Sequence, residues 1–215
     1  SLRLVNIGCG KNPINGFINY DNNIFLFLHK IPFLKSILEK FSFIPLGFIQ
    51  LMEIATKREI KYCNASKRIP ERNESVDLIY CCHMIEHLDY EETNNFFMEC
   101  KRVLKPGGIA RIIVPDFDKL IDSYNQNHDV DSFINNSCLV GKKPKTIIKK
   151  LQYLLQGHGW HHQMFTKNSF DKKIKFHGFS EVKFFEAGES AIPFENGINY
   201  FDFSGQSIYC EFTKK

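Results

Sequence analysis

Short apolar runs that are typical of buried strands alternate along this chain with segments of helical spacing. The run at 75–81 is apolar enough to be a central strand of a parallel sheet. Residues 91–104 carry apolar positions along one helical face. Further strands are predicted at 4–7, 17–21, 60–63, 109–114, 181–185 and 207–212, and a further helix at 168–177. This alternation predicts an α/β, Rossmann-like architecture with a largely parallel sheet.

The length of the chain suits one domain with an insertion, and we expect a single domain over 1–215. Residues 22–58 interrupt the alternation and are predicted to form a helical insertion, because apolar residues recur there at helical spacing. Charged and histidine positions cut its apolar runs well below the ~20 residues of a membrane span. Helices packed on the core or over the active site are favoured, and an interfacial helix that contacts lipid or a lipid-linked substrate is the alternative. Residues 117–165 are expected to be helix and loop on the substrate side.

Charge and cysteine content restrict the class of protein. The net charge is +4, and the lysines are scattered in short clusters, which disfavours a nucleic-acid partner. Seven cysteines, an odd number, stand mostly in apolar runs, as buried free thiols do in a reducing compartment. The chain opens directly into a predicted strand, without a signal-peptide pattern. A cytoplasmic location is therefore expected.

The first predicted strand ends in the turn Gly8-Cys9-Gly10. Glycines have no Cβ, so a ligand can approach such a backbone closely. In doubly wound sheets these turns lie at the carboxyl edge, where nucleotides bind. The third glycine of the dinucleotide pattern is absent, since Asn12 and Pro13 occupy that region, and a pyrophosphate-binding turn is disfavoured.

Two further polar positions follow predicted strands at the same edge. Asp21 ends the second strand and is able to accept hydrogen bonds from both ribose hydroxyls of an adenosine. A simple turn aspartate is the alternative. Asn64 and Ala65 follow the third strand, where an amide oxygen can accept from an adenine amino group and a backbone N–H can donate to the ring.

Four segments in the right order resemble the compact class I S-adenosylmethionine-dependent methyltransferases, the methyltransferase type 11-like group. They are 4–10, 16–21, 75–88 and 99–116, which are spread over about half of the chain, and the run ECKRVLKPGG at 99–108 is among the most recognisable of them. The resemblance implies a seven-stranded, mostly parallel sheet with an antiparallel last strand. It also implies S-adenosyl-L-methionine as the cofactor.

The resemblance also implies roles for individual residues. Gly8 and Gly10 would lie under the methionine part of the cofactor, Asp21 on the ribose, and His83 near the sulfonium. The family often has an acid where Asn6 and Asn64 stand, and both asparagines keep hydrogen-bond acceptors. The expected cofactor-binding residues are Asn6, Gly8, Cys9, Gly10, Asp21, Asn64, Ala65, Cys82 and His83.

Methyl transfer from a sulfonium is a direct displacement, for which a protein mainly supplies alignment and dehydration. An oxygen nucleophile of high pKa would still benefit from a general base. His83, directly after the fourth strand, is the first candidate for a catalytic residue, and packing against the following helix is its alternative role. Asp116, at the end of the fifth strand, is expected to contact the substrate.

The run GHGWHHQMF at 157–165 contains three histidines. His158 and His161 are candidates for acid–base work, and Trp160 for substrate contact. The alternative is a loop packed on the sheet edge through Trp160 and Phe165. No carboxylate or cysteine at a suitable spacing accompanies the histidines, so we expect no metal.

The leading functional hypothesis is a methyltransferase that acts on a small-molecule or saccharide-like acceptor. The alternatives are a cofactor-binding module without turnover, and an RNA or protein methyltransferase. Enzymes that methylate amino groups of bases often carry an Asn/Asp-Pro-Pro-aromatic motif after the fourth strand. Cys81-Cys82-His83-Met84 stands there instead, which counts against N-methylation of bases.

Overall fold

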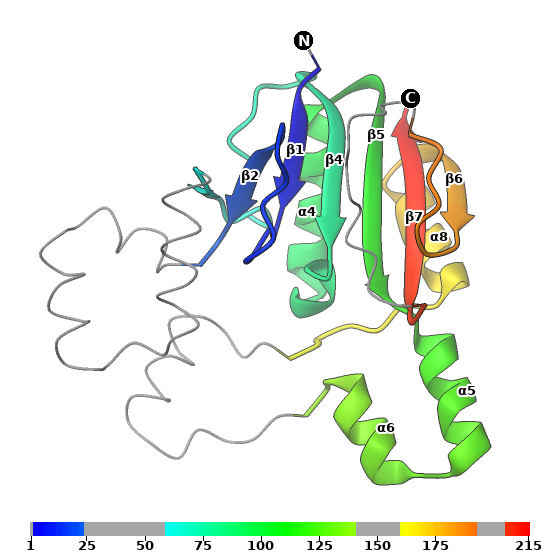
Figure 1. The fold of residues 1–215 in the computed structure, drawn as a ribbon. Helices are drawn as coiled ribbons and strands as arrows, with labels where there is room; N and C mark the ends of the chain where they lie inside the picture. Colours follow the sequence, from blue (N-terminus) through cyan, green and yellow to red (C-terminus); the bar gives the residue numbers. More distant parts are fainter. Residues whose placement is uncertain (1, 24–58, 141–159, 193–204) are drawn as a thin grey trace, which may run out of the picture.

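The computed structural model describes residues 2–23, 59–140, 160–192 and 205–215 (Figure 1). Seven strands form one sheet in the order β3-β2-β1-β4-β5-β7-β6. The first five pair in parallel, and β7 is antiparallel to both of its neighbours. The strands are β1 (Leu4–Ile7), β2 (Ile18–Asp21), β3 (Lys61–Tyr62), β4 (Val76–Cys82), β5 (Leu104–Pro115), β6 (Phe179–Phe185) and β7 (Ser207–Lys214). The expected mostly parallel sheet with an antiparallel last strand is confirmed.

The described helices follow the sheet strands or extend from their carboxyl edge. They are η1 (Ile85–His87), α4 (Tyr90–Val103), α5 (Phe117–Asn127), α6 (Val130–Ser137) and α8 (Lys167–Phe176). Helix α4 begins at a capping box, in which the Asp89 carboxylate accepts from the Glu92 amide and the Glu92 carboxylate accepts from the Asp89 amide. The helical insertion predicted at 22–58 lies, apart from its first two residues, outside the described part of the chain. None of the helices that the structure describes is long and apolar enough to cross a membrane.

The apolar run predicted as a central strand is β4, between β1 and β5. Alternate residues of β4 enter two different cores, because successive side chains of a strand point to opposite faces. Ile79 and Cys81 join the larger core, which α4 and α8 cover. Leu78 and Tyr80 join a smaller core on the other face. Burial on both faces explains why this strand is apolar without alternation.

The transition from α4 to β5 differs from the prediction. A strand was expected at 109–114, but β5 already begins at Leu104, which pairs with Val76. The register shifts between Val76 and Leu78, and Gly107 has a positive φ of 77°. A backbone position with φ in this left-handed region favours glycine, which has no Cβ. The Pro-Gly-Gly run therefore forms an irregularity within the strand.

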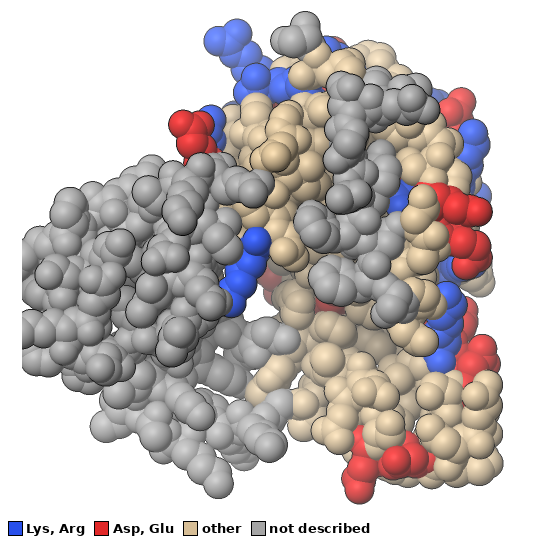
Figure 2. All heavy atoms as spheres, in the orientation of Figure 1, with Lys and Arg blue, Asp and Glu red and all other residues tan. Residues whose placement is uncertain are grey.

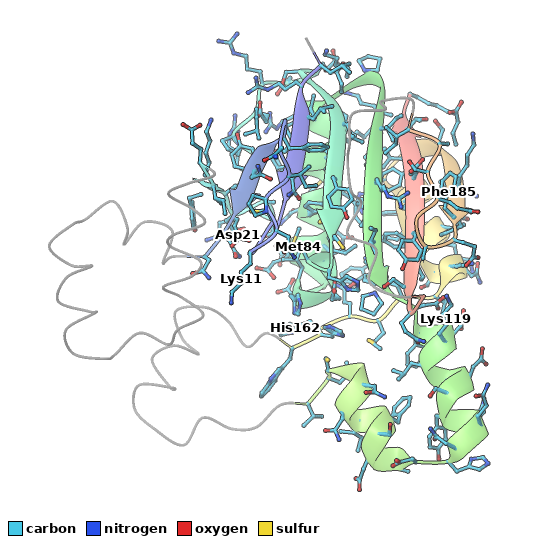
Figure 3. The ribbon with its side chains drawn as sticks, viewed as in Figure 1. Lys11, Asp21, Met84, Lys119, His162 and Phe185 are labelled. Atoms are coloured by element: carbon cyan, nitrogen blue, oxygen red, sulfur yellow. The ribbon has the colours of Figure 1, made fainter. Side chains whose placement is uncertain are left out.

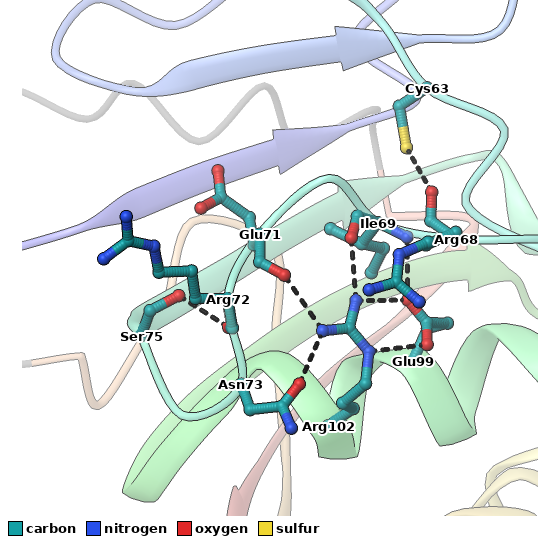
Figure 4. A network of polar contacts seen from close by, with 9 residues as sticks. All are labelled: Cys63, Arg68, Ile69, Glu71, Arg72, Asn73, Ser75, Glu99 and Arg102. Carbon is teal, nitrogen blue, oxygen red and sulfur yellow. Dashed lines mark hydrogen bonds and ion pairs between the residues drawn. The ribbon is translucent and has the colours of Figure 1, made fainter.

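Arg102 connects α4 to the loop between β3 and β4 (Figure 4). Its guanidinium makes a bidentate ion pair with Glu99, at 2.7 and 2.6 Å. It also donates to the carbonyl oxygens of Ile69 (2.7 Å) and Glu71 (2.9 Å). The Glu99 carboxylate accepts from the Ile69 amide at 2.8 Å. These contacts hold the loop against the helix, because the Ile69 amide bonds to Glu99 while the Ile69 and Glu71 carbonyls bond to its ion-pair partner Arg102.

We expect Glu99→Gln to lower the free energy of unfolding by about 1–3 kcal/mol at neutral pH, because charged hydrogen bonds are lost. Burial acts to raise the pKa of Glu99, but the Arg102 side chain and the Ile69 amide outweigh it and hold that pKa below its ordinary value. A lowered pKa in the folded state means that this stability is present above pH ~4.5 and is lost as the pH falls further. Urea unfolding at pH 7 and pH 3.5 should therefore give a difference between wild type and variant that shrinks in acid. Glu91→Gln, on the exposed face of the same helix, is the matched control and should change little at either pH.

Charged side chains are dispersed on the face drawn in Figure 2. Basic and acidic residues alternate along the edge, and the described surface over the sheet is mostly uncharged. A continuous basic face, which nucleic-acid binding favours, is not seen on the described part of this face. This agrees with the scattered lysines of the sequence.

Candidate functional site

A pocket of about 210 Å³ opens at the carboxyl ends of β1 and β4. Lys11, Asp21 and Met84 all lie at this end of the sheet (Figure 3). Six of the nine expected cofactor-binding residues line the pocket. The lining residues are Asn6, Gly8, Cys9, Gly10, Lys11, Asn12, Tyr80, Cys82 and His83.

The glycine turn after β1 is attached to β2 through its backbone. The amides of Gly8 and Cys9 both donate to the Tyr20 carbonyl oxygen, at 2.9 and 3.1 Å. Gly8 has a φ of 71°, and a Cβ at this position would lie 2.6 Å from Cγ of Met84. The sequence suggested that Gly8 is small so that a ligand can approach. The structure gives a different reason for its size, since the close neighbour is the Met84 side chain.

Gly10 keeps the open approach that was expected of the turn. Its φ is 51°, and no described atom lies within 4 Å of where its Cβ would be. Its amide donates to Oδ2 of Asp21 at 2.8 Å, and the Asn23 amide donates to Oδ1 at 2.9 Å. The Asn22 amide also donates to this carboxylate, and a carboxylate has about four lone-pair sites, so it can accept a further hydrogen bond. The residues at this end of the sheet therefore fit a ligand that carries a hydroxyl group.

Two side chains at the pocket, Asp21 and Cys9, have pKa values above their ordinary values. Burial raises the pKa of Asp21, although the backbone amides of Gly10, Asn23 and Asn22 act to lower it. Burial also raises the pKa of the Cys9 thiol well above its ordinary value. Cys9 therefore faces the pocket as a neutral thiol and not as a nucleophilic thiolate.

Asn6 and Asn19 hold the loop that replaces a crossover helix between β1 and β2. The Asn6 amide group donates to Oδ1 of Asn19 at 2.9 Å and to the Asn12 carbonyl at 3.3 Å. Asn19 in turn exchanges hydrogen bonds with the backbone of Ile14. Asn19 was not among the predicted site residues. A buried amide inside an apolar strand was the signal that could have identified it.

Asn64 and Ala65 do not line the pocket. Oδ1 of Asn64 already accepts from the amide and hydroxyl of Ser66, at 3.2 and 2.7 Å. Ala65 belongs to the larger core. Both nevertheless lie near Asp21, because the Cys63 amide donates to the Asp21 carbonyl at 2.9 Å.

His83 occupies the turn after β4 and lines the pocket. Its φ of 51° is unusual for a residue with a Cβ. Nδ1 lies 3.0 Å from Oε1 of Glu86, and Nε2 lies 3.1 Å from the Ser207 hydroxyl. Because the carboxylate of Glu86 only accepts hydrogen bonds, Nδ1–H donates to it, and the lone pair on Nε2 then accepts from the Ser207 hydroxyl. The ring is therefore oriented as a general base requires.

Asp116 stands at the carboxyl end of β5, but outside the residues that line the pocket. It is buried and caps α5, because its Oδ1 accepts from the Asp118 amide at 3.1 Å. Its own amide donates to the Gln206 carbonyl. Asp116 therefore connects β5, α5 and the residue before β7.

The run at 157–165 is described from Trp160 onward, and His158 lies outside the described residues. It packs along η1 and the beginning of α4. The amides of His162 and Gln163 donate to the Glu86 carbonyl, at 2.7 and 3.2 Å. The Trp160 carbonyl accepts from Nδ1 of His87 at 3.0 Å. Phe165 is buried in the larger core, so the run is attached at both of its described ends.

This docking brings a carboxylate to the histidines. Glu86, His87 and His161 each direct one potential ligand atom to within 4.8 Å of the others. Burial lowers the pKa of His161, although the Glu86 carboxylate acts in the opposite direction. No suitable carboxylate was found near the histidines in the sequence, because Glu86 lies about 75 residues before His161.

Three pocket residues were not predicted, namely Lys11, Asn12 and Tyr80. Tyr80 shares a face of β4 with Cys82, since the two are separated by one residue. Strand alternation was therefore a usable signal for Tyr80. Lys11 and Asn12 directly follow the glycine turn, and their place at the pocket results from how the loop folds back.

Residues 48–112 match the family model of the methyltransferase domain. No curated protein matches the chain. Among solved structures, the chain is similar to an S-adenosylmethionine-dependent methyltransferase of Thermotoga maritima, described as a possible histamine N-methyltransferase. The alignment covers 100% of this chain and 83% of that one, with 17% identity and a TM-score of 0.55. A methyltransferase of Methanosarcina mazei aligns over 98% and 90% of the two chains, with 17% identity and a TM-score of 0.52.

The fold and the local sequence match agree with each other. At these identities the solved structures establish the fold alone. The family match covers β3, β4, α4 and most of β5, which include the segment that carries His83. Residues 48–112 thus match the methyltransferase-domain family, and the fold of the described chain is that of solved S-adenosylmethionine-dependent methyltransferases.

Proposed function

We propose that this protein transfers a methyl group from S-adenosylmethionine to a small-molecule or saccharide-like acceptor. The observation that carries the proposal is the pocket at the ends of β1 and β4, where an open Gly10, the Asp21 carboxylate beside it and an oriented His83 come together. None of the seven cysteines, all of which lie in the described residues, forms a disulfide bond, which supports action in a reducing compartment such as the cytoplasm.

The cofactor supplies an activated methyl group on a sulfonium, and the protein has to align and dehydrate the reactants. In this proposal Asp21 accepts hydrogen bonds from the ribose hydroxyls, and the open backbone at Gly10 admits the cofactor chain. Asn6, Gly8, Cys9 and Cys82 form the surrounding wall, and Asn64 and Ala65 remain the candidates for adenine contact.

His83 acts in this proposal as the general base. An acceptor hydroxyl takes the place of the Ser207 hydroxyl at Nε2 and gives its proton to that nitrogen. Glu86 keeps the ring oriented and stabilises the charged imidazolium that results. Asp116, Trp160 and His161 stay candidates for acceptor contact, because they belong to segments at the same end of the sheet. His158 stays a candidate from its place in the run at 157–165 alone.

The first experiment separates an enzyme from a cofactor-binding module. Calorimetry with S-adenosylmethionine should detect binding. Formation of S-adenosylhomocysteine should then depend on an added acceptor, in a panel of sugar nucleotides, small alcohols and small amines, with RNA as a further arm. Binding without turnover in any arm would favour the module, and turnover only with RNA would favour the nucleic-acid alternative. Absence of binding at millimolar cofactor would overturn the proposal.

We expect His83→Asn to lower kcat by roughly 10²- to 10⁴-fold, the usual contribution of a general base. Asparagine tolerates the left-handed backbone of this position but is too short to replace the imidazole. The Kd for S-adenosylmethionine should change by only a few fold. His128→Asn is the matched control, because His128 also has a positive φ of 52° and caps an exposed helix end. Unchanged kcat in His83→Asn would remove His83 from the chemistry.

A further inference from the structure

Three side chains from two distant segments converge beside the pocket. Glu86 and His87 belong to η1, and His161 belongs to the segment that packs on it. One potential ligand atom of each lies within 4.8 Å of the other two. Ligand atoms of a metal ion lie about 2.0–2.2 Å from it and so roughly 3–4 Å apart. A movement of about 1 Å or less would therefore bring the three into coordination distance.

The Glu86 carboxylate carries a polar atom that no described group satisfies. Its side chain is 1% exposed. Oε1 faces Nδ1 of His83, but Oε2 is buried without a hydrogen-bond partner. A buried, unpartnered carboxylate oxygen is costly, and buried charges are normally paired or bound to metal. Oε2 therefore indicates that a cation belongs at this position.

Both histidines have a ring nitrogen available for a metal. Nδ1 of His87 donates to the Trp160 carbonyl at 3.0 Å, which leaves a lone pair on Nε2. A backbone carbonyl on the second nitrogen is the usual way in which a metal-binding histidine is oriented. Nδ1 of His161 is buried and has no hydrogen-bond partner within the described part of the chain. The two rings lie edge to face, with centroids 5.1 Å apart.

The surrounding backbone holds these groups in place. The Glu86 carbonyl accepts from the amides of His162 and Gln163. The Gln163 side chain donates to the carbonyls of Leu88 and Asp89, at 2.8 and 2.7 Å. The His161 amide donates to the Cys138 carbonyl at 3.0 Å. The cluster is thus formed by an ordered docking of two segments and not by exposed side chains that happen to be close.

We propose that Glu86, His87 and His161 bind one divalent transition-metal ion of the Zn²⁺ or Fe²⁺ type. Two imidazoles and a carboxylate are ligands that suit these ions. Three protein ligands leave at least one coordination position for water or for an acceptor oxygen. His83 touches both Glu86 and the pocket, so the ion is held next to the site of the proposed reaction.

Metal binding can be measured without methyl transfer, so this proposal stands or falls separately from the proposed function. Untagged, chelator-treated protein is titrated with ZnCl₂ in a calorimeter at neutral pH. We expect one ion per chain. Glu86→Gln and His161→Gln should each weaken binding by about 100-fold or more, since loss of a supporting residue alone typically costs 10- to 100-fold. Zn²⁺ should raise the Tm of the wild type and leave the Tm of His161→Gln unchanged.

His162→Gln is the matched control, because His162 is the next residue along the chain, is exposed and is outside the cluster. It should bind Zn²⁺ within about twofold of wild type. Glu86→Gln preserves the shape of the side chain, and circular dichroism identifies any variant that does not fold. No binding by the wild type, equal losses in His161→Gln and His162→Gln, or full binding by folded Glu86→Gln would each overturn the proposal.

Discussion

Asp21→Asn is expected to raise the Kd for S-adenosylmethionine by roughly 10- to 100-fold, with little loss of stability. A hydrogen bond to a charged group contributes about 1.5–3 kcal/mol, and the carboxylate is proposed to accept from the ribose hydroxyls. Asparagine keeps one oxygen for the Gly10 amide, which Asp21 holds at 2.8 Å, so the glycine turn should persist. Calorimetric titration of the variant with S-adenosylmethionine measures the change.

The pH dependence of binding gives a second check on Asp21. Burial raises the pKa of this carboxyl above its ordinary value of 3.8, against the lowering effect of the Gly10, Asn23 and Asn22 amides. Only the carboxylate accepts from two hydroxyls, so wild-type affinity should fall as the pH falls through this raised pKa. The variant should lack that dependence. Asp129→Asn, which replaces one helix cap with an equally good one, should leave affinity unchanged. Equal affinities of Asp21→Asn and wild type would refute the proposed ribose contact.

Gly8→Ala is expected to lower the free energy of unfolding by about 2–4 kcal/mol. Its Cβ would lie 2.6 Å from Cγ and 2.7 Å from Cβ of Met84, and overpacking of this kind costs roughly 1–3 kcal/mol. The φ of 71° adds about 1 kcal/mol for any residue with a Cβ. Urea unfolding followed by circular dichroism measures the sum.

The two contributions at Gly8 can be separated. Gly16→Ala is the matched control, because Gly16 has a φ of 82° but no described atom within 4 Å of its Cβ position. Gly16→Ala should lower the free energy of unfolding only by the backbone contribution, about 1 kcal/mol. In a Met84→Ala background, Gly8→Ala should lose most of its packing cost, which a double-mutant cycle would detect. Equal costs for Gly8→Ala and Gly16→Ala would show that Met84 does not restrict this turn.

Several features of the fold and site were predictable because they depend on neighbouring residues. Strands at 4–7 and 75–81 follow from continuous apolar runs, and both lie at the centre of the sheet. The glycines of the turn allow the positive φ values that Gly8 and Gly10 adopt. Since parallel strands present their carboxyl ends at one edge, the sequence also predicted that the glycine turn, Asp21 and His83 would be near one another.

Contacts between distant segments were not predictable in the same way. Strand β5 begins at Leu104 because β4 offers Val76 as a partner, and no local pattern in the Pro-Gly-Gly run indicates this pairing. The spacing argument against a metal considered only neighbours of the histidines. It missed Glu86, whose carbonyl binds the segment that carries His161.

The order of the strands along the chain, the glycine turn and the acid at the end of β2 could therefore be predicted from the residues alone. The reason is that backbone conformation and burial pattern are local properties. Three contacts could be known only from the folded chain: Met84 packs on Gly8, Glu86 orients His83, and Glu86, His87 and His161 converge. Those contacts depend on how two segments dock, which is set by hydrogen bonds and packing between residues about 75 positions apart.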